Sequence, residues 1–182
     1  MKQQICWVIS MSKIELNRHL IGTINIHDGV IDITDPGYDS DVWCRMNNVK
    51  VMPGVWNCYA YKGCHPRLGN RVWIVQIVIA DGPYNEIAEK KIQSRKSWRR
   101  IGEIGVDSGL AGFFNHKMNF SYKEWSDLCD MMFNTETQNG SAYIKQFLTG
   151  DGFWTESGIG DGCYTVHAIR VDRKIVALEI RF

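Results

Sequence analysis

The sequence lacks the features that mark several large classes of protein. No stretch approaches the roughly 20 apolar residues that a membrane-spanning helix needs, so we expect no contact with a membrane. The formal net charge is only +1, whereas general binders of nucleic acid usually carry a marked basic excess. Disorder is not indicated, because 45% of the residues are hydrophobic and 23% are charged. What remains is a globular chain whose local charge pattern matters more than its average.

Proline-rich linkers, internal repeats and low-complexity tracts are missing too. At 182 residues, the chain therefore predicts a single domain over residues 1–182. The apolar stretch from Ile5 to Ile9 is short and has no convincing cleavage site, so we expect an N-terminal strand rather than a signal peptide. The six cysteines are scattered, and without an export signal we expect reduced thiols and a cytoplasmic protein.

Motifs for catalysis and metal binding are scarce. Cys58, Cys64 and His65 are the best candidate metal ligands, but no second ligand pair stands at a zinc-site spacing. The sequence has no Gly-x-Ser-x-Gly nucleophile elbow, no P-loop and no dinucleotide fingerprint. We therefore expect a protein that is not an enzyme, with no catalytic residue, no metal and no cofactor.

Short apolar and β-branched segments separated by turn residues predict that the chain is mainly strands. Asp28-Gly29 predicts the turn of a hairpin between the segments on either side of it. Arg71–Ala80 is the most apolar run and predicts a central strand buried on both faces. Gly162–Val171 and Lys174–Phe182 predict a C-terminal hairpin that turns at Asp172-Arg173.

Helices are expected in fewer places. Ser121–Phe133 begins with a capping box, Ser121 with Glu124, and continues with apolar residues at helical spacing. A second helix is expected over Ser141–Leu148, while Asn85–Trp98 fits a short helix or a strand. The fold class expected from these patterns is α+β, a mainly antiparallel β-sheet or sandwich with one or two helices.

A basic cluster is the first candidate for a binding surface. Clustered Lys and Arg neutralise phosphates, and an interleaved aromatic ring can stack on a base. The alternative interpretation is a solvated face that keeps the chain soluble. Trp98 within the cluster, and Trp154 elsewhere, have polar neighbours and are predicted to be exposed interface anchors. The candidate partner- or nucleic-acid-binding residues are Lys90, Lys91, Arg95, Lys96, Trp98, Arg99 and Arg100.

An acidic cluster is the second candidate. Three interpretations stay open: turn residues that bond their own backbone, a calcium loop, or a row of negative charge presented to a basic groove. The spacing does not match an EF-hand, and the terminal Glu is absent. The residues of this candidate acidic patch are Asp28, Asp32, Asp35, Asp39 and Asp41.

Two runs dense in Gly and Asp are the third candidate. They surround Asp107 and Asp161, and tight turns are their ordinary use. Two carboxylates brought together can also perform acid–base work, which keeps a hydrolase or nucleotide-binding domain open as an alternative.

These runs also carry a resemblance to a known family. The chain over about residues 29–182 resembles an uncharacterised family of bacterial and phage domains with Val-Asp-x-Gly and Gly-Asp-Gly-x-Tyr motifs. The residues that carry it are Asp35-Pro36-Gly37, Pro53-Gly54, Gly105-Val106-Asp107-Ser108-Gly109-Leu110-Ala111-Gly112-Phe113, Gly160-Asp161-Gly162-Cys163-Tyr164 and Glu179-Ile180-Arg181-Phe182.

The whole chain further resembles type II-A anti-CRISPR proteins of gut-bacterial and phage origin. This resemblance implies an anti-defence protein that binds the RNA-guided type II CRISPR nuclease and its guide RNA and blocks recognition or cleavage of target DNA. DNA or RNA are then possible further contacts, through a basic patch that holds a backbone or carboxylates that mimic one. An immunity-type protein that binds a single partner is the remaining alternative.

Overall fold

A computed structural model gives the fold. It describes residues 15–38, 44–115, 123, 126–127, 130, 146–148 and 152–182.

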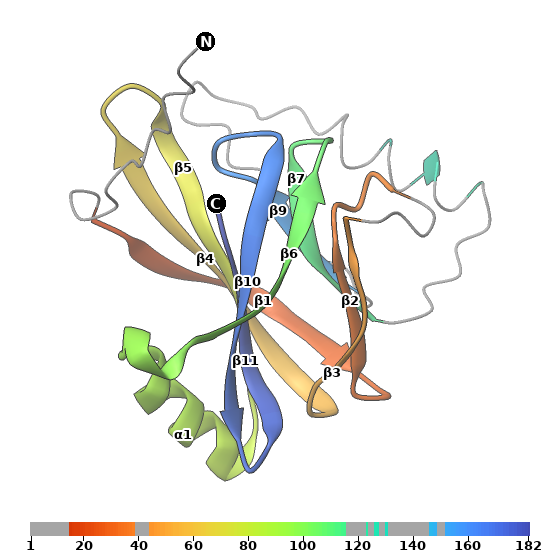
Figure 1. The fold of residues 1–182 in the computed structure, drawn as a ribbon, viewed down its shortest axis with the longest axis vertical. Coiled ribbons are helices and arrows are strands. Elements are labelled where there is room, and N and C mark those ends of the chain that lie inside the picture. Colours follow the sequence, from red (N-terminus) through yellow and green to blue (C-terminus); the bar gives the residue numbers. More distant parts are fainter. Residues whose placement is uncertain are drawn as a thin grey trace, which may run out of the picture.

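Strands dominate and form two antiparallel sheets that face each other (Figure 1). The order of the larger sheet is β1 (Asn17–Ile26), β4 (Gly54–His65), β5 (Gly69–Ile79), β11 (Lys174–Arg181), β10 (Gly162–Val171) and β6 (Arg99–Val106). The order of the smaller sheet is β3 (Met46–Lys50), β2 (Val30–Thr34), β7 (Leu110–Asn115), β9 (Gly152–Glu156) and β8 (Gln146–Leu148). Together with the helix α1 (Gly82–Ile92), this confirms the predicted α+β class with mainly antiparallel sheets.

The core lies between the sheets, and α1 packs on the opposite face of the larger sheet (Figure 1). The register explains this division, because neighbouring strands place partnered residues on the same face. Val166, Ile180, Val75 and Ala60 form one cross-strand row, and all four are buried. The next row is polar and faces the side of α1; it runs through Arg100, His167, Glu179, Gln76 and Tyr59.

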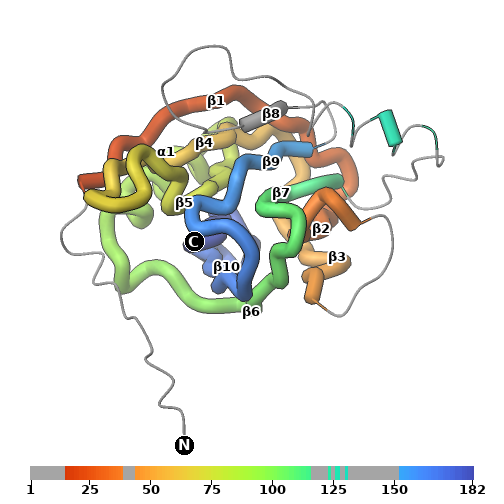
Figure 2. The backbone as a smooth tube through the Cα atoms, turned by 90° about the horizontal axis from the view of Figure 1, so that it is seen from above, coloured from red at the N-terminus to blue at the C-terminus, as the bar shows by residue number. Residues whose placement is uncertain are grey.

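The two sheets meet along β6 and β3, which lie close together in both views (Figure 2). The Gly105 N–H donates a hydrogen bond to the Cys44 carbonyl at 2.7 Å. Gly102 packs so closely against Met46 that a Cβ there would lie 2.6 Å from its sulfur. Glycines on β6 therefore allow the smaller sheet to approach this edge of the larger one.

The predicted hairpin at Asp28-Gly29 is wrong. β1 pairs with β4, and β2 pairs with β3 and β7, so this turn carries the chain from one sheet to the other. Gly29 has φ +68°, and a Cβ there would lie 2.8 Å from the Val51 carbonyl oxygen. The turn residues mark the bend correctly, but burial of Ile26 and Ile31 in the shared core decides the pairing.

A second turn between the sheets follows β6, at Asp107-Ser108-Gly109. The buried carboxylate of Asp35 accepts hydrogen bonds there from the N–H groups of Asp107 (2.8 Å) and Ser108 (2.7 Å) and from the Ser108 hydroxyl. It also accepts the N–H of Gly37 at 2.7 Å. This one side chain ties the end of β2 to the turn between β6 and β7.

Other predicted elements have mixed outcomes. β5 is confirmed as a central strand, buried from Val72 to Ile79 between β4 and β11. The C-terminal hairpin is confirmed, and both residues of its turn, Asp172 and Arg173, have positive φ. Of the two alternatives for residues 85–98, the helix is the one that forms: it runs over Gly82–Ile92 and is followed by a single 3-10 turn, η2 (Arg95–Ser97).

The two remaining helix predictions lie largely outside the described residues. Within 121–133, the structure describes positions 123, 126, 127 and 130, and they are helical. The helix expected over 141–148 is wrong at its end, because Gln146–Leu148 is the strand β8 paired with β9. In the part of the chain that the structure describes, no helix combines the length and the apolar character needed to cross a bilayer.

Candidate nucleic-acid interface

The basic cluster spans the end of α1, the turn η2 and the start of β6. Lys90 and Lys91 stand in the last turn of α1, where cations interact favourably with the helix dipole. Arg95 and Lys96 belong to η2, and Arg99 begins β6 together with Arg100. Apart from the half-buried Lys91, these cations are exposed, as the prediction requires.

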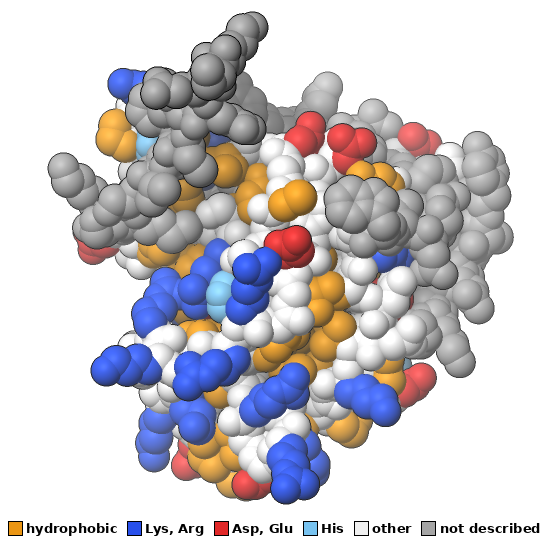
Figure 3. Space-filling view, viewed as in Figure 1, with side chains coloured by type: hydrophobic (Ala, Val, Ile, Leu, Met, Phe, Trp, Pro, Cys, Tyr) orange, Lys and Arg blue, Asp and Glu red, His pale blue; other side chains and the backbone are white. Residues whose placement is uncertain are grey.

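The C-terminal hairpin adds cations that sequence reasoning missed. β10 pairs with β6, with Ala168 opposite Arg99 and His167 opposite Arg100. Figure 3 shows Lys and Arg side chains gathered over the region of α1, β6, β10 and β11. We call this surface the basic face and define it as Lys90, Lys91, Arg95, Lys96, Arg99 and Arg100 with Arg170, Arg173, Lys174 and Arg181.

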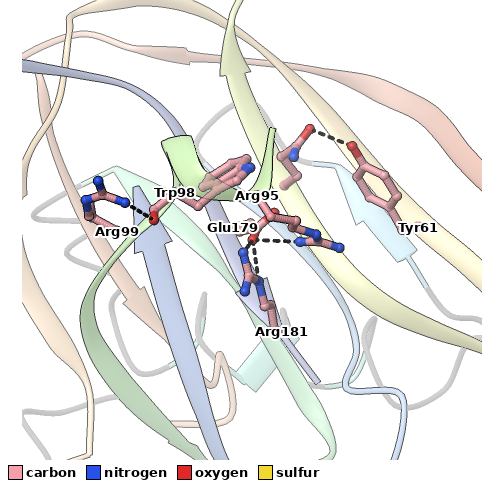
Figure 4. A network of polar contacts seen from close by, with 7 residues as sticks. Tyr61, Arg95, Trp98, Arg99, Glu179 and Arg181 are labelled. Carbon is pink, nitrogen blue, oxygen red and sulfur yellow. Dashed lines mark hydrogen bonds and ion pairs between the residues drawn. The ribbon is translucent and has the colours of Figure 1, made fainter. Parts of the chain in front are cut away.

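Acids in the same elements are fewer, and several are already paired. Glu103 pairs with Arg100 at 2.5 Å, and Glu89 pairs with Arg18 of β1 at 2.7 Å. The buried Glu179 accepts hydrogen bonds from Arg95 at 3.4 Å and from Arg181 (Figure 4). Since the whole chain is nearly neutral, positive charge is segregated to this face.

Burial governs the ionisation of Glu179. Removal from water raises its pKa, and the neighbouring Arg181 and Arg95 oppose that shift. Gln76 contributes a further hydrogen bond to the carboxylate and itself accepts the hydroxyl of Tyr61 at 3.3 Å. The carboxylate thus fixes two guanidinium groups of the basic face in place.

Trp98 does not serve as an exposed ring. It is 5% exposed and packs into the hydrophobic core, so the prediction of a stacking anchor is wrong. Its place explains the local geometry: its N–H donates to the Arg95 carbonyl at 3.3 Å, and its own carbonyl accepts from the Arg99 side chain at 3.3 Å. Trp154 is 0% exposed, so the same prediction fails there. Both rings carry large apolar surfaces, and burying these outweighs their polar sequence neighbours.

His167 stands among the arginines of this face. Burial lowers its pKa to about 4, with Arg181, Arg100 and Arg95 adding to the effect in that order. The ring is therefore neutral at physiological pH. The sequence does not indicate this environment, because the spatial neighbours of His167 are distant from it in the sequence.

The acidic patch does not form as predicted. Asp35 is 0% exposed and Asp32 is buried as well, so neither carboxylate can be presented to a partner. Asp32 accepts the N–H of Asn48 at 2.9 Å and pairs with Arg45 at 3.3 Å. Both carboxylates thus bind backbone N–H groups of other segments of the fold, whereas Asp28 is exposed. Asp39 and Asp41 lie outside the described residues.

Asp107 and Asp161 do lie at the same end of the molecule. Val106, the last residue of β6, pairs with Gly162, the first residue of β10, so Asp107 directly follows β6 and Asp161 directly precedes β10. Both are exposed, and both raise the pKa of Tyr38, for which burial is the largest cause. A surface depression of about 420 Å³ lies elsewhere, beside His19, Lys62 and Cys64, and includes neither aspartate.

The candidate metal ligands are separated. Cys58 is buried on β4, which raises the pKa of its thiol, whereas Cys64 is exposed near the end of the same strand. Within the described segments, no three His, Cys, Asp or Glu side chains converge as metal ligands would.

Comparison with protein-family models, with curated proteins and with solved structures found no match to this chain.

Proposed function

We propose that this chain is a non-enzymatic inhibitor of an RNA-guided type II CRISPR nuclease, and that its basic face contacts the guide RNA or the target DNA. The observation that carries the proposal is the meeting of two distant cationic segments on one surface. The 90–100 segment and the C-terminal hairpin are brought together by the pairing of β6 with β10.

Such a surface suits a phosphate backbone. Each Lys or Arg that neutralises a phosphate releases a condensed counterion, which drives association and makes it depend on salt. Arginine adds a planar fork that matches phosphate oxygens with two parallel hydrogen bonds. Exposed arginines on η2, β6 and the hairpin supply several such forks.

The sequence resemblance gives the direction of this proposal. A type II nuclease holds its guide–target heteroduplex in a positively charged channel and recognises backbone rather than sequence. An inhibitor that grips the nucleic acid from outside competes for the same phosphates. It acts in the cytoplasm, where thiols such as the free Cys44, Cys58, Cys64 and Cys163 stay reduced.

The burial of Asp32 and Asp35 removes two members of the acidic cluster as charge mimics. We therefore assign inhibition to the cationic route. A mimic of nucleic acid would bind the nuclease without its guide RNA. The cationic route predicts instead that binding requires the guide RNA or the target DNA.

The direct test is inhibition of target cleavage by a purified nuclease–guide complex. The paired substitutions Lys96→Gln/Arg99→Gln and Arg170→Gln/Arg173→Gln each remove cations that hold no carboxylate in the described structure. We expect each pair to raise the half-inhibitory concentration by roughly tenfold or more. Arg67→Gln/Arg71→Gln, at the far tip of β4 and β5, is the matched control and should leave inhibition unchanged. Equal inhibition by all three variants would contradict the proposal.

A hydrolase or nucleotide-binding domain is the second candidate, and the shared position of Asp107 and Asp161 favours it. It predicts turnover of a phosphate ester that Asp161→Asn abolishes without loss of the fold. If Asp161→Asn inhibits the nuclease as well as the parent protein does, Asp161 has no part in the inhibition.

A further inference from the structure

His167 lies in the polar row on the outer face of the larger sheet. Its cross-strand partners are Arg100 on β6 and Glu179 on β11. The side chain is half-buried, and its Nδ1 atom is buried without a hydrogen-bond partner among the described residues. No protein group in the described part of the chain therefore holds this ring as Glu179 holds its arginines.

Charged groups lie around His167 on three neighbouring elements. Arg181 of β11, Arg100 of β6 and Arg95 of η2 act on the ring electrostatically, and Glu179 of β11 is its cross-strand partner. Glu103 of β6 lies three positions after Arg100 and pairs with it. Both acids are already engaged, Glu103 by Arg100 and Glu179 by Arg95 and Arg181. Cations outnumber acids around a ring that carries no charge of its own.

This arrangement leaves hydrogen-bond donors for an incoming group. A guanidinium carries five N–H donors, so one carboxylate contact does not exhaust it. The side chains of Arg95 and Arg100 remain 59% and 57% exposed in spite of their ion pairs. A neutral imidazole adds a further polar atom, and an anion placed beside it favours its protonated form.

We propose that His167, Arg100 and Arg181, with Arg95 beside them, form a phosphate-binding subsite of the basic face that takes one phosphodiester group of a nucleic acid. The subsite rests on the function proposed above, since it is part of the same surface. At this one position the nucleic acid is anchored by hydrogen bonds. The other cations of the basic face act mainly through their charge.

The subsite has a consequence for pH. In the free protein, the pKa of His167 is held near 4 by burial and by three guanidinium groups. A bound phosphodiester places a negative charge beside the ring and raises that pKa, because an opposite charge favours the protonated form. By linkage, nucleic-acid binding must then strengthen as the pH falls from neutrality toward the pKa of the bound state.

The experiment uses the full chain and a short oligothymidine with hydroxyl ends, whose phosphodiesters do not titrate in this range. We expect NMR titration to show the pKa of His167 rising by about 1 to 2 when the oligothymidine is bound. His19 is exposed on β1 outside the basic face and is the control residue. Affinity should increase by about 1.3-fold to about 4-fold between about pH 7.5 and pH 5.5, the larger value for the larger rise in pKa.

The variant His167→Gln separates the contribution of this ring to the pH dependence of binding from the contributions of other titrating groups. Protonation of Glu179 also releases arginines, but that effect persists in His167→Gln, so the difference between parent and variant isolates the histidine. We expect His167→Gln to weaken the pH dependence, with His19→Gln as the control that keeps it. An unchanged His167 titration in a complex that Arg170→Gln/Arg173→Gln weakens would overturn the subsite and leave the basic face standing. Absence of any salt-dependent oligothymidine binding would overturn both the subsite and the proposed role of the basic face.

Discussion

At the scale of residues, single polar side chains hold the parts of this protein in register. The carboxylate of Asp35 bridges segments 72 residues apart in the sequence and is fully buried. Buried ionised groups are tolerated only where hydrogen bonds replace water, and Asp35 receives them from two N–H groups of the opposite turn and from the Ser108 hydroxyl. The motif residue Asp35 thereby has a structural explanation that needs no chemistry.

Asp35→Asn tests this explanation. The amide places an N–H₂ group where donors already converge, so we expect a loss of about 2 to 4 kcal/mol in the free energy of unfolding. Urea denaturation followed by tryptophan fluorescence measures it. Asp28→Asn, on the exposed turn at the end of β1, should change stability by less than about 0.5 kcal/mol. A similarly small change in the free energy of unfolding for Asp35→Asn would show that the hydrogen bonds of Asp35 contribute little to stability.

His167 supplies a second prediction at this scale. Because its pKa is lowered to about 4 in the folded protein, the unfolded chain takes up a proton first as the pH falls. Stability is therefore lost between about pH 6.5 and pH 4, and His167→Gln removes that component. The ring is half-buried, so solvent screening limits the difference to the order of 1 kcal/mol. Parallel stability curves for parent and variant over this range would contradict the account.

At the scale of elements, the sequence located turns well and pairings poorly. Asp28-Gly29 and Asp107-Ser108-Gly109 were recognisable bends, yet both lead from one sheet to the other. Local residues set the bend, whereas the burial of apolar residues on either side sets the partner strand. The C-terminal hairpin was predictable because Asp172-Arg173 and the strands beside it are adjacent in the sequence.

The candidate site shows the same limit. Counting back from the turn would pair His167 with Leu178, but a register shift between Ile169 and Arg170 makes Glu179 its partner. That single shift puts His167 beside the arginines that Glu179 holds, and the residue pattern does not show it. The prediction that Trp98 and Trp154 are exposed was wrong for a related reason, since polar neighbours in the sequence do not show where a ring points.

Gly112 tests how tightly two elements are packed. A Cβ at this position of β7 would lie 2.2 Å from the Phe153 carbonyl oxygen and 2.9 Å from the Trp154 Cα on β9. Backbone atoms cannot move aside as a flexible side chain can, so we expect Gly112→Ala to lower the free energy of unfolding by about 3 kcal/mol. Gly69→Ala is a control that meets no atom within 4 Å but has φ +71°, and a cost near 1 kcal/mol is expected there.

At the scale of the whole molecule, the sheets collect charges that the sequence disperses. The chain is nearly neutral, but the pairing of β6 with β10 gathers cations from two segments on one side. In contrast, two of the five aspartates of the predicted acidic patch, Asp32 and Asp35, are buried. The molecule therefore presents a cationic surface on a mainly β scaffold, and we propose that a polyanion binds to that surface.

The salt dependence of oligothymidine binding tests this claim most directly. For single strands, the slope of log affinity against log salt is about −0.7 for each phosphate neutralised. We predict that Lys96→Gln/Arg99→Gln and Arg170→Gln/Arg173→Gln each reduce the steepness of this slope by about 1, and that Arg67→Gln/Arg71→Gln does not. Identical slopes for the parent protein and all three variants would contradict the claim that the two segments form one nucleic-acid-binding face.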